Sequence, residues 1–351
     1  MNSLKVLLSY SLKNTFVLRD YNLLVSKGHT VLTLESPPYS DLIRFSFNRI
    51  KEVVLGFFYL RKADAVISWF NDYHSTALIF WAKLMGKPSL LIIGGYDAIS
   101  SPKLQYGIFL NKNLRSYLAR WNYLNASEIW VVHQSLEQGC SIALKQQGTF
   151  SGIRYFLPQI KTNILEVPTA YNFNYWKKEG VKKEKTVLTV ANIPDERTWV
   201  RKGVPLFIKL AEYLPDYKFT LAGIQNELLS KKILPQNIKL LGRCSAEVLK
   251  KEYSRHQFYF QGSLIEGLPN VLCEAMLCEC IPLGNRVFGI PDAIGATGFV
   301  FNGAQDLKTV VEFIQGVTED SDLGFYARKR IIENYPSQRR MQAFENFLNN
   351  V

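Results

Sequence analysis

The sequence has no long hydrophobic run and no secretory leader. Its longest apolar stretches, such as VVLGFFYL at 53–60, fall far short of the roughly 20 residues that span a bilayer. The first residues, MNSLKVLLSY, lack the charged region, long apolar core and small-residue cleavage site of a signal peptide. We therefore expect a cytoplasmic protein.

Cysteine and histidine are scarce and scattered. No cysteine pair has the CxxC spacing, and the four histidines (His29, His74, His133 and His256) show no metal-ligand spacing. We expect reduced, buried cysteines and no metal centre. The five cysteines are Cys140, Cys244, Cys273, Cys278 and Cys280.

Three common nucleotide and hydrolase motifs are also missing. No GxGxxG follows the first strand-like segment, which argues against a nicotinamide or flavin enzyme. No GxxxxGK[ST] is present, so the chain is not expected to be a P-loop NTPase. The absence of GxSxG argues against an α/β-hydrolase.

Positive charge, by contrast, is in excess. The formal net charge is +12; residues 1–167 carry 18 Lys/Arg against 10 Asp/Glu (+8), and residues 168–351 carry 24 against 20 (+4). Such a balance favours polyanionic partners: nucleic acid, anionic lipid surfaces or phosphorylated substrates. Charge alone leaves all three open.

Apolar strand-like runs alternate with amphipathic helical segments along the whole chain. This alternation predicts two consecutive doubly wound α/β domains with parallel sheets. We predict an N-terminal domain at 1–167 and a C-terminal domain at 168–336, with a last helix at about 337–351 that packs back on the first domain. We also predict a helix over 104–124 and an interdomain crossing at the charge run 177–185.

The most informative segment is GSLIEGLPNVLCEAM, residues 262–276. It follows the strand-like FYFQ and enters a helix near Pro269, since proline is favoured in a first turn. The helix amides after it would face a ligand at the positive end of the helix dipole, which suits a phosphate. Glu266 precedes this turn and Glu274 follows it by about one helical turn. Carboxylates therefore flank the expected phosphate-binding turn on both sides.

These residues resemble the E-x7-E signature of retaining glycosyltransferases of family 4. The match includes the residue pattern EGxPNVLxEAM. Four further segments show a weaker likeness to the family: IKLLGRCSAEVLKKEYSRHQFYFQGS, CIPLGNRVFGIPDAIGATGFVF, KPSLLIIGGYDA and EIWVVHQS. The resemblance implies the GT-B fold, in which two Rossmann-like domains face a central cleft.

Residue by residue, the resemblance assigns Glu266 to hydroxyls of the transferred sugar and Glu274 to the ribose. It assigns backbone contacts with the sugar and diphosphate to Gly267, Leu268, Pro269, Asn270 and Val271. The Gly242-Arg243-Cys244 loop would lie along the base. The first domain would present Gly94, Gly95 and Asp97 to the cleft.

Lys202 matches a lysine that in this family pairs with the donor diphosphate. A fixed cation suits the negative charge that develops on a leaving diphosphate when no metal is present. The family's second cation, usually an arginine, is replaced by Asn192, so Arg197 or Arg201 is expected to supply the charge. A histidine common in relatives is likewise replaced, by Gly94.

These observations predict a metal-independent, retaining hexosyltransferase. It would need no cofactor and would use a nucleoside-diphosphate sugar, either GDP-mannose or a UDP-hexose, and a glycan or lipid-linked acceptor in polysaccharide or glycoconjugate synthesis. A sugar-nucleotide epimerase of the same fold is the alternative, and a nucleic-acid-binding protein a weaker one. The basic amphipathic segment 42–62 fits either a core-packing helix or peripheral contact with the inner face of a membrane.

Overall fold

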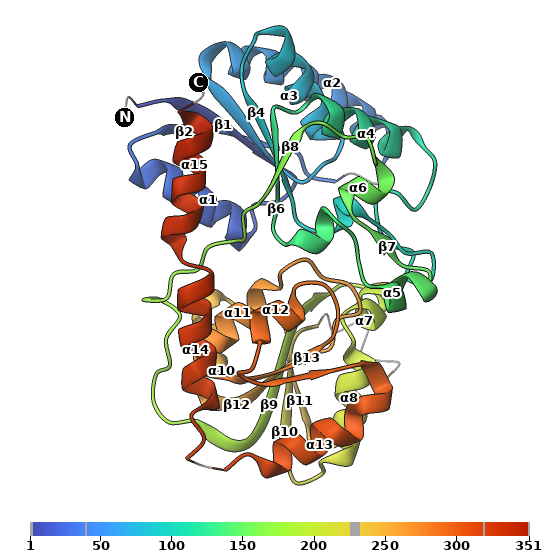
Figure 1. Ribbon diagram of the computed structural model, residues 1–351, viewed down its shortest axis with the longest axis vertical. Helices are drawn as coiled ribbons and strands as arrows, with labels where there is room; N and C mark the ends of the chain where they lie inside the picture. Colours follow the sequence, from blue (N-terminus) through green and yellow to red (C-terminus); the bar gives the residue numbers. More distant parts are fainter. Residues whose placement is uncertain (1–2, 39–40, 225–231, 319, 350–351) are drawn as a thin grey trace. The chain divides into compact units, whose positions relative to one another are not determined.

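The computed structural model describes residues 3–38, 41–224, 232–318 and 320–349. The chain divides into two compact units, one formed by Met1–Ala170 with Ser337–Val351 and the other by Tyr171–Pro336. Each unit contains its own parallel sheet covered by helices (Figure 1). No helix in the described ranges is both long and apolar enough to cross a membrane.

The first unit is built on a parallel sheet whose order is β2-β1-β3-β4-β6-β8. Its strands are β1 (Lys5–Tyr10), β2 (Thr30–Glu35), β3 (Ala65–Trp69), β4 (Ser89–Ile93), β6 (Glu128–Val131) and β8 (Asn163–Glu166). Two short segments form a separate antiparallel ribbon, β5 (Ile99–Ser100) and β7 (Phe150–Ser151).

Helices cover both faces of this sheet. They are α1 (Thr15–Ser26), α2 (Leu42–Lys62), α3 (Tyr73–Leu84), α4 (Leu114–Asn125), α5 (Ile142–Gln146), α6 (Ile153–Phe156) and α15 (Ser337–Leu348). Val66 packs in the core beneath α2 and α3. Trp69, three residues later on the same strand, points to the opposite face, where it contacts residues of α1 and α15.

The second unit has the sheet order β11-β10-β9-β12-β13-β14, also parallel. Its strands are β9 (Lys183–Ile193), β10 (Lys218–Ile224), β11 (Ile238–Leu241), β12 (His256–Gln261), β13 (Ile281–Asn285) and β14 (Phe299–Phe301). The helices are α7 (Glu196–Arg201), α8 (Val204–Tyr213), α10 (Ala246–Arg255), α11 (Asn270–Leu277), α12 (Ile290–Ile294), α13 (Leu307–Gly316) and α14 (Leu323–Asn334).

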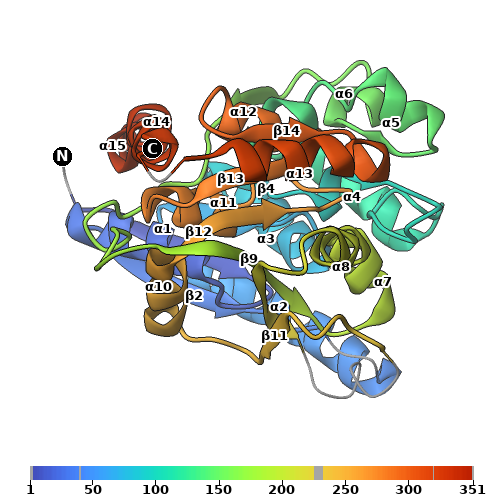
Figure 2. The same ribbon diagram turned by 90° about the horizontal axis from the view of Figure 1, so that it is seen from below.

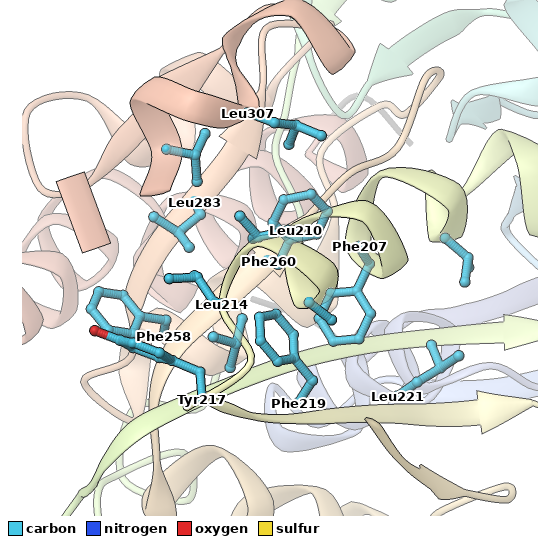
Figure 3. Close-up of a cluster of buried hydrophobic side chains, with 14 of the residues drawn as sticks. Phe207, Leu210, Leu214, Tyr217, Phe219, Leu221, Phe258, Phe260, Leu283 and Leu307 are labelled. Atoms are coloured by element: carbon cyan, nitrogen blue, oxygen red, sulfur yellow. The ribbon is translucent and has the colours of Figure 1, made fainter. Parts of the chain in front are cut away.

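A large aromatic and aliphatic core holds this second sheet against α8 and α13 (Figures 2 and 3). The ring of Phe207 on α8 lies 5.2 Å from that of Phe219 on β10 and 5.7 Å from that of Phe260 on β12. Because Phe260 is the penultimate residue of β12, this packing fixes the end of that strand. The loop that leaves β12 therefore starts from a rigid position.

The doubly wound fold and most of the predicted elements are confirmed, including the helix at 42–62. Two expectations are wrong. The helix predicted over 104–124 begins only at Leu114, because Asn113 caps it and Gly107 has a φ of 114° in the turn before it. The charge run 177–185 lies inside the second unit, which starts at Tyr171, and its last residues already belong to β9.

Candidate active site

The order of strands in the second unit creates a switch point between β9 and β12. From this point the chain winds outward in both directions, through β10 to β11 and through β13 to β14. The segments that follow β9 and β12 therefore diverge and leave a crevice at the carboxyl edge of the sheet, the usual ligand position in such folds. Lys202 follows β9, and Glu266 follows β12.

Lys202 and Glu266 form an ion pair at this switch point. The ammonium nitrogen of Lys202 donates to the Glu266 Oε2 at 2.6 Å. Each side chain is 18% exposed, so the pair is largely enclosed but still open to solvent on one side. The two residues are 64 positions apart in sequence, and the fold places a cation and a carboxylate together where a ligand can reach both.

Glycine makes this juxtaposition possible. Gly203, directly after Lys202, has a φ of 71°, and a Cβ there would overlap the backbone carbonyl of Gly262. The two chain segments are joined further by a hydrogen bond from the Leu264 amide to the Arg201 carbonyl, at 2.8 Å. The close approach of the two backbones thus brings Lys202 to the loop that carries Glu266.

Helix α11 begins beside this loop. Pro269 is its N-cap, one position earlier than the first-turn place that the sequence predicts, and the first helical hydrogen bond runs from the Cys273 amide to the Pro269 carbonyl. The helix itself thus supplies no acceptor to the amides of Val271 and Leu272. These amides lie at the positive end of the helix, a favourable position for an anion.

The remaining residues of the predicted turn have structural contacts as well. The carbonyl of Gly267 accepts a hydrogen bond from the Gly289 amide at 3.0 Å, which ties the loop to the start of α12. Leu268 is buried, and Asn270 is the first residue of α11. Glu274 lies one turn inside the helix and is only 4% exposed.

Four buried polar side chains that the sequence analysis missed support the loop before Glu266. The Tyr259 hydroxyl donates to the Gln261 side-chain oxygen, and the Gln261 amide group donates to the Ser263 hydroxyl at 2.7 Å. The Asn285 side chain donates to the Ser263 carbonyl at 3.1 Å. A sequence signal for three of these side chains was available, because polar residues occupy every second position, 259, 261 and 263, at the end of an apolar strand.

The two candidate arginines differ in their surroundings. Arg197 is 64% exposed and lies 3.6 Å from Asp195. Asp195 caps α7, and the hydrogen bond from the Thr198 amide holds the pKa of its carboxyl below the usual range. Arg201 is only partly exposed, and its own carbonyl is bonded to the loop before Glu266. Arg201 is therefore the arginine that the backbone anchors to the site.

The predicted base loop lies at the edge of the same sheet. Gly242 follows β11, and its carbonyl accepts from the Gly223 amide at 3.1 Å. Arg243 is exposed, while partial burial raises the pKa of the Cys244 thiol. Two strands separate β11 from β12, a span of about 14 Å at the usual strand spacing. The loop therefore lies beside the carboxyl edge, at the strand farthest on this side from β12.

The loop after β4 in the first unit contains the other predicted residues. Asp97 is buried and its carboxylate accepts from the amides of Gly95, at 2.9 Å, and Asn71, at 3.1 Å. Burial raises the pKa of Asp97 to about 6. At Gly94 a Cβ would collide with the ring of Phe70, so a histidine there would require that ring to move.

Within the described residues, no group of three or more His, Cys, Asp or Glu side chains is arranged to hold a metal ion. The candidate site consists of the cation of Lys202, the carboxylate of Glu266 and the amides at the start of α11. Such a set can bind a diphosphate and accept hydrogen bonds from neighbouring hydroxyls.

Residues 173–338 match the family described as Glycosyl transferases group 1. This region contains every site residue named above for the second unit. No curated protein matches the chain in sequence.

Solved structures share the fold. HepE from Anabaena, in complex with UDP and glucose, has a TM-score of 0.71 and 15% identity, and the match covers 99% of this chain and 100% of HepE. The catalytic domain of starch synthase IV from Arabidopsis thaliana, bound to ADP and acarbose, has a TM-score of 0.71 and 12% identity, with 99% of this chain and 99% of that domain covered.

TarM from S. aureus, solved with UDP and other ligands, has a TM-score of 0.64 and 16% identity over 85% of this chain. The chain spans 59% of the length of TarM. The family match thus concerns residues 173–338, and the solved structures, which are 12–16% identical, share the fold.

Proposed function

We propose that this protein transfers a hexosyl group from a nucleoside-diphosphate sugar to a hydroxyl of a glycan or lipid-linked acceptor, with retention of anomeric configuration. The observation that carries the proposal is the Lys202–Glu266 ion pair at the switch point, beside the amino end of α11. It combines a cation for a diphosphate with a carboxylate for sugar hydroxyls.

The comparisons support a nucleotide-sugar donor. HepE is solved with UDP and glucose, starch synthase IV with ADP, and TarM with UDP, so proteins of this fold bind different nucleotides. We propose GDP-mannose or a UDP-hexose as the donor of this protein. The matched family region includes the whole of the candidate donor site.

In the proposed mechanism the donor diphosphate lies between the Lys202 ammonium and the backbone N–H groups of the 267–271 turn, to which Pro269 contributes none. Lys202 exchanges part of its contact with Glu266 for the diphosphate, and Glu266 accepts hydrogen bonds from the sugar. Arg201 supplies the second cation, and Glu274 holds the ribose. Fixed positive charge stabilises the diphosphate as the bond to the anomeric carbon breaks, and this stabilisation needs no metal.

The acceptor is proposed to bind the first unit, at the loop that contains Gly94, Gly95 and Asp97. Its hydroxyl forms the new bond to the anomeric carbon on the face from which the diphosphate leaves. A leaving phosphate oxygen takes the hydroxyl proton, so no protein nucleophile is required. The role that follows is polysaccharide or glycoconjugate synthesis.

Calorimetric titration with a panel of sugar nucleotides, followed by transfer assays with the donor that binds, tests this proposal. Lys202→Met and Glu266→Gln are each expected to lower transfer by at least about 100-fold, the usual cost of losing one charge-stabilising group. Lys250→Met is the matched control, because it removes a similarly enclosed lysine, 15% exposed, whose ion pair with Glu179 lies elsewhere in the same unit. It should leave transfer within about twofold of the wild-type rate.

Near wild-type transfer by the Lys202 or Glu266 variant, with the fold intact, would overturn these roles. Incubation with the donor alone separates transfer from the epimerase alternative. A transferase needs an added acceptor, whereas an epimerase converts the nucleotide sugar itself.

A further inference from the structure

Helix α2 has an apolar stripe on its outer side. Ile43, Phe47, Ile50 and Val54 follow one another at helical spacing and are 81%, 67%, 65% and 48% exposed. The buried side of the helix is opposite. Glu52, which is buried, comes nine residues after Ile43, and at about 100° per residue this places it half a turn away.

Helices α3 and α4 also expose apolar side chains. Helix α3 packs against both α2 and α4 and exposes Phe80 and Leu84, while α4 exposes Leu114 and Tyr117. A separate groove of about 590 Å³ between the three helices is lined on α2 by Phe45, Arg49, Glu52 and Val53, which lie on the side of the helix opposite the stripe. We call the exposed apolar side chains of these three helices the α2–α4 face.

The charges on these helices have almost one sign. The three helices contain eight Lys and Arg residues but a single acidic residue, Glu52, which is buried and bonded to Arg49 at 2.6 Å. The basic residues of α2 that are exposed are Arg44, Lys51, Arg61 and Lys62. A second copy of the chain would bring the same positive charges together, which disfavours self-association through this face.

We infer that the α2–α4 face binds the surface of an anionic lipid bilayer. Its exposed apolar side chains enter the boundary between headgroups and acyl chains, and the basic residues of α2 contact anionic headgroups. Large exposed apolar side chains and exposed basic residues on the same helix are the features of a peripheral membrane site. The inference goes beyond the proposed transfer reaction and does not depend on it.

Flotation of the full chain with vesicles tests the inference directly. Binding to phosphatidylcholine vesicles that contain phosphatidylglycerol should exceed binding to phosphatidylcholine alone by at least about 10-fold. Raising the salt should weaken it, because the screening length falls from about 10 Å at 0.1 M to about 3 Å at 1 M.

Two variants separate the apolar and ionic contributions. The double substitution Ile43→Gln and Phe47→Gln should lower partitioning about 10-fold or more, since it removes two inserting side chains. Arg44→Gln with Lys51→Gln should weaken binding to the anionic vesicles and reduce its salt dependence. The matched control, Ile142→Gln with Phe325→Gln, alters equally exposed apolar residues elsewhere (73% and 56% exposed) and should bind like the wild type.

The inference is overturned if the wild-type chain does not float with anionic vesicles, or if the control variant loses as much binding as the variant of Ile43 and Phe47. It is also overturned if sedimentation shows a dimer that the Ile43 and Phe47 substitutions dissociate, without any vesicle binding. In that case the face is a self-association surface.

Discussion

His256, the first residue of β12, links α10 to β10 through its two ring nitrogens. Its Nδ1 lies 2.7 Å from the Glu252 carbonyl, which can only accept, so Nδ1 carries the proton. Its Nε2, 2.9 Å from the Thr220 hydroxyl, is then the acceptor. Burial lowers the pKa of His256 to about 4, and the nearby Arg255, Lys182 and Lys183 act in the same direction.

This depressed pKa makes the stability of the second unit depend on pH. In the unfolded chain His256 titrates near its ordinary value of about 6.5, so the folded state binds fewer protons between that pH and about 4. The stabilisation is complete above pH 6.5 and is lost as the pH falls towards 4, at up to about 1.4 kcal/mol per unit.

We therefore expect His256→Gln to flatten the dependence of the unfolding free energy on pH between about 6.5 and 4.5. Urea unfolding over this range measures the change. Above pH 7.5 the histidine is neutral in both the folded and the unfolded state. The curves of unfolding free energy against pH should therefore be parallel for the wild type and the variant in that range. His74, whose pKa burial also lowers to about 4, keeps its contribution in the variant. Identical slopes of unfolding free energy against pH for the wild type and the variant between pH 6.5 and 4.5 would contradict a lowered pKa of His256.

At the scale of elements, the contact between the α7–α8 turn and the end of β12 depends on Gly203. Alanine there would require a left-handed backbone and would also overlap the Gly262 carbonyl. Gly180 is the matched control, since its φ of 81° is similar but no atom lies within 4 Å of the position of its Cβ.

Gly180→Ala is expected to cost about 1 kcal/mol of unfolding free energy, the strain of the left-handed conformation alone. Gly203→Ala should cost more than about 3 kcal/mol, because two backbone segments must also separate. It should weaken binding of the sugar nucleotide by at least about 10-fold, since Lys202 moves with the turn. Equal effects of the two substitutions in unfolding and titration experiments would show that the close approach is unimportant.

The elements of this fold were predictable wherever a local pattern determines them. The strands that form both sheets are apolar runs between turns, and helix α2 follows from its periodicity alone. The start of α4 was not predictable, because it depends on how Gly107 meets the carbonyl of Ile99 eight residues earlier. A local pattern contains no information about that approach.

The same distinction applies to the candidate site. Residue types and spacing single out Glu266 and the start of α11, and the family resemblance adds Lys202. The hydrogen bond between Lys202 and Glu266 crosses from one side of the switch point to the other and therefore depends on the strand order. The polar side chains of Gln261 and Asn285 that support the loop likewise meet only in the folded sheet.

At the scale of the whole molecule, the chain leaves the first unit at Ala170 and returns to it at Ser337. Arg340 holds α15 to the rest of the first unit. Its guanidinium donates twice to Asp20, at 2.6 Å each, and once each to the carbonyls of Val167 and Pro168. The side chain is 1% exposed and its guanidinium packs against Trp69, Trp130 and Phe344.

Arg340→Met should therefore destabilise the first unit by about 3–5 kcal/mol, because it leaves the Asp20 carboxylate buried without its partner. Lys27→Met is the control. It removes an ion pair with Glu345 on the same helix, but Lys27 is 38% exposed, so the expected cost is at most about 1 kcal/mol. Adding Asp20→Asn to Arg340→Met should recover part of the loss, since no charge is then left buried.

Hydrogen exchange followed by mass spectrometry distinguishes the two units in the intact protein. Since the contacts of Arg340 all lie within the first unit, its peptides should lose protection in Arg340→Met while peptides from 171–336 keep theirs. Loss of protection throughout the chain would mean that α15 stabilises both units. A loss no greater than that of Lys27→Met would mean that packing of α15, and not its buried cation, holds the end of the chain to the first unit.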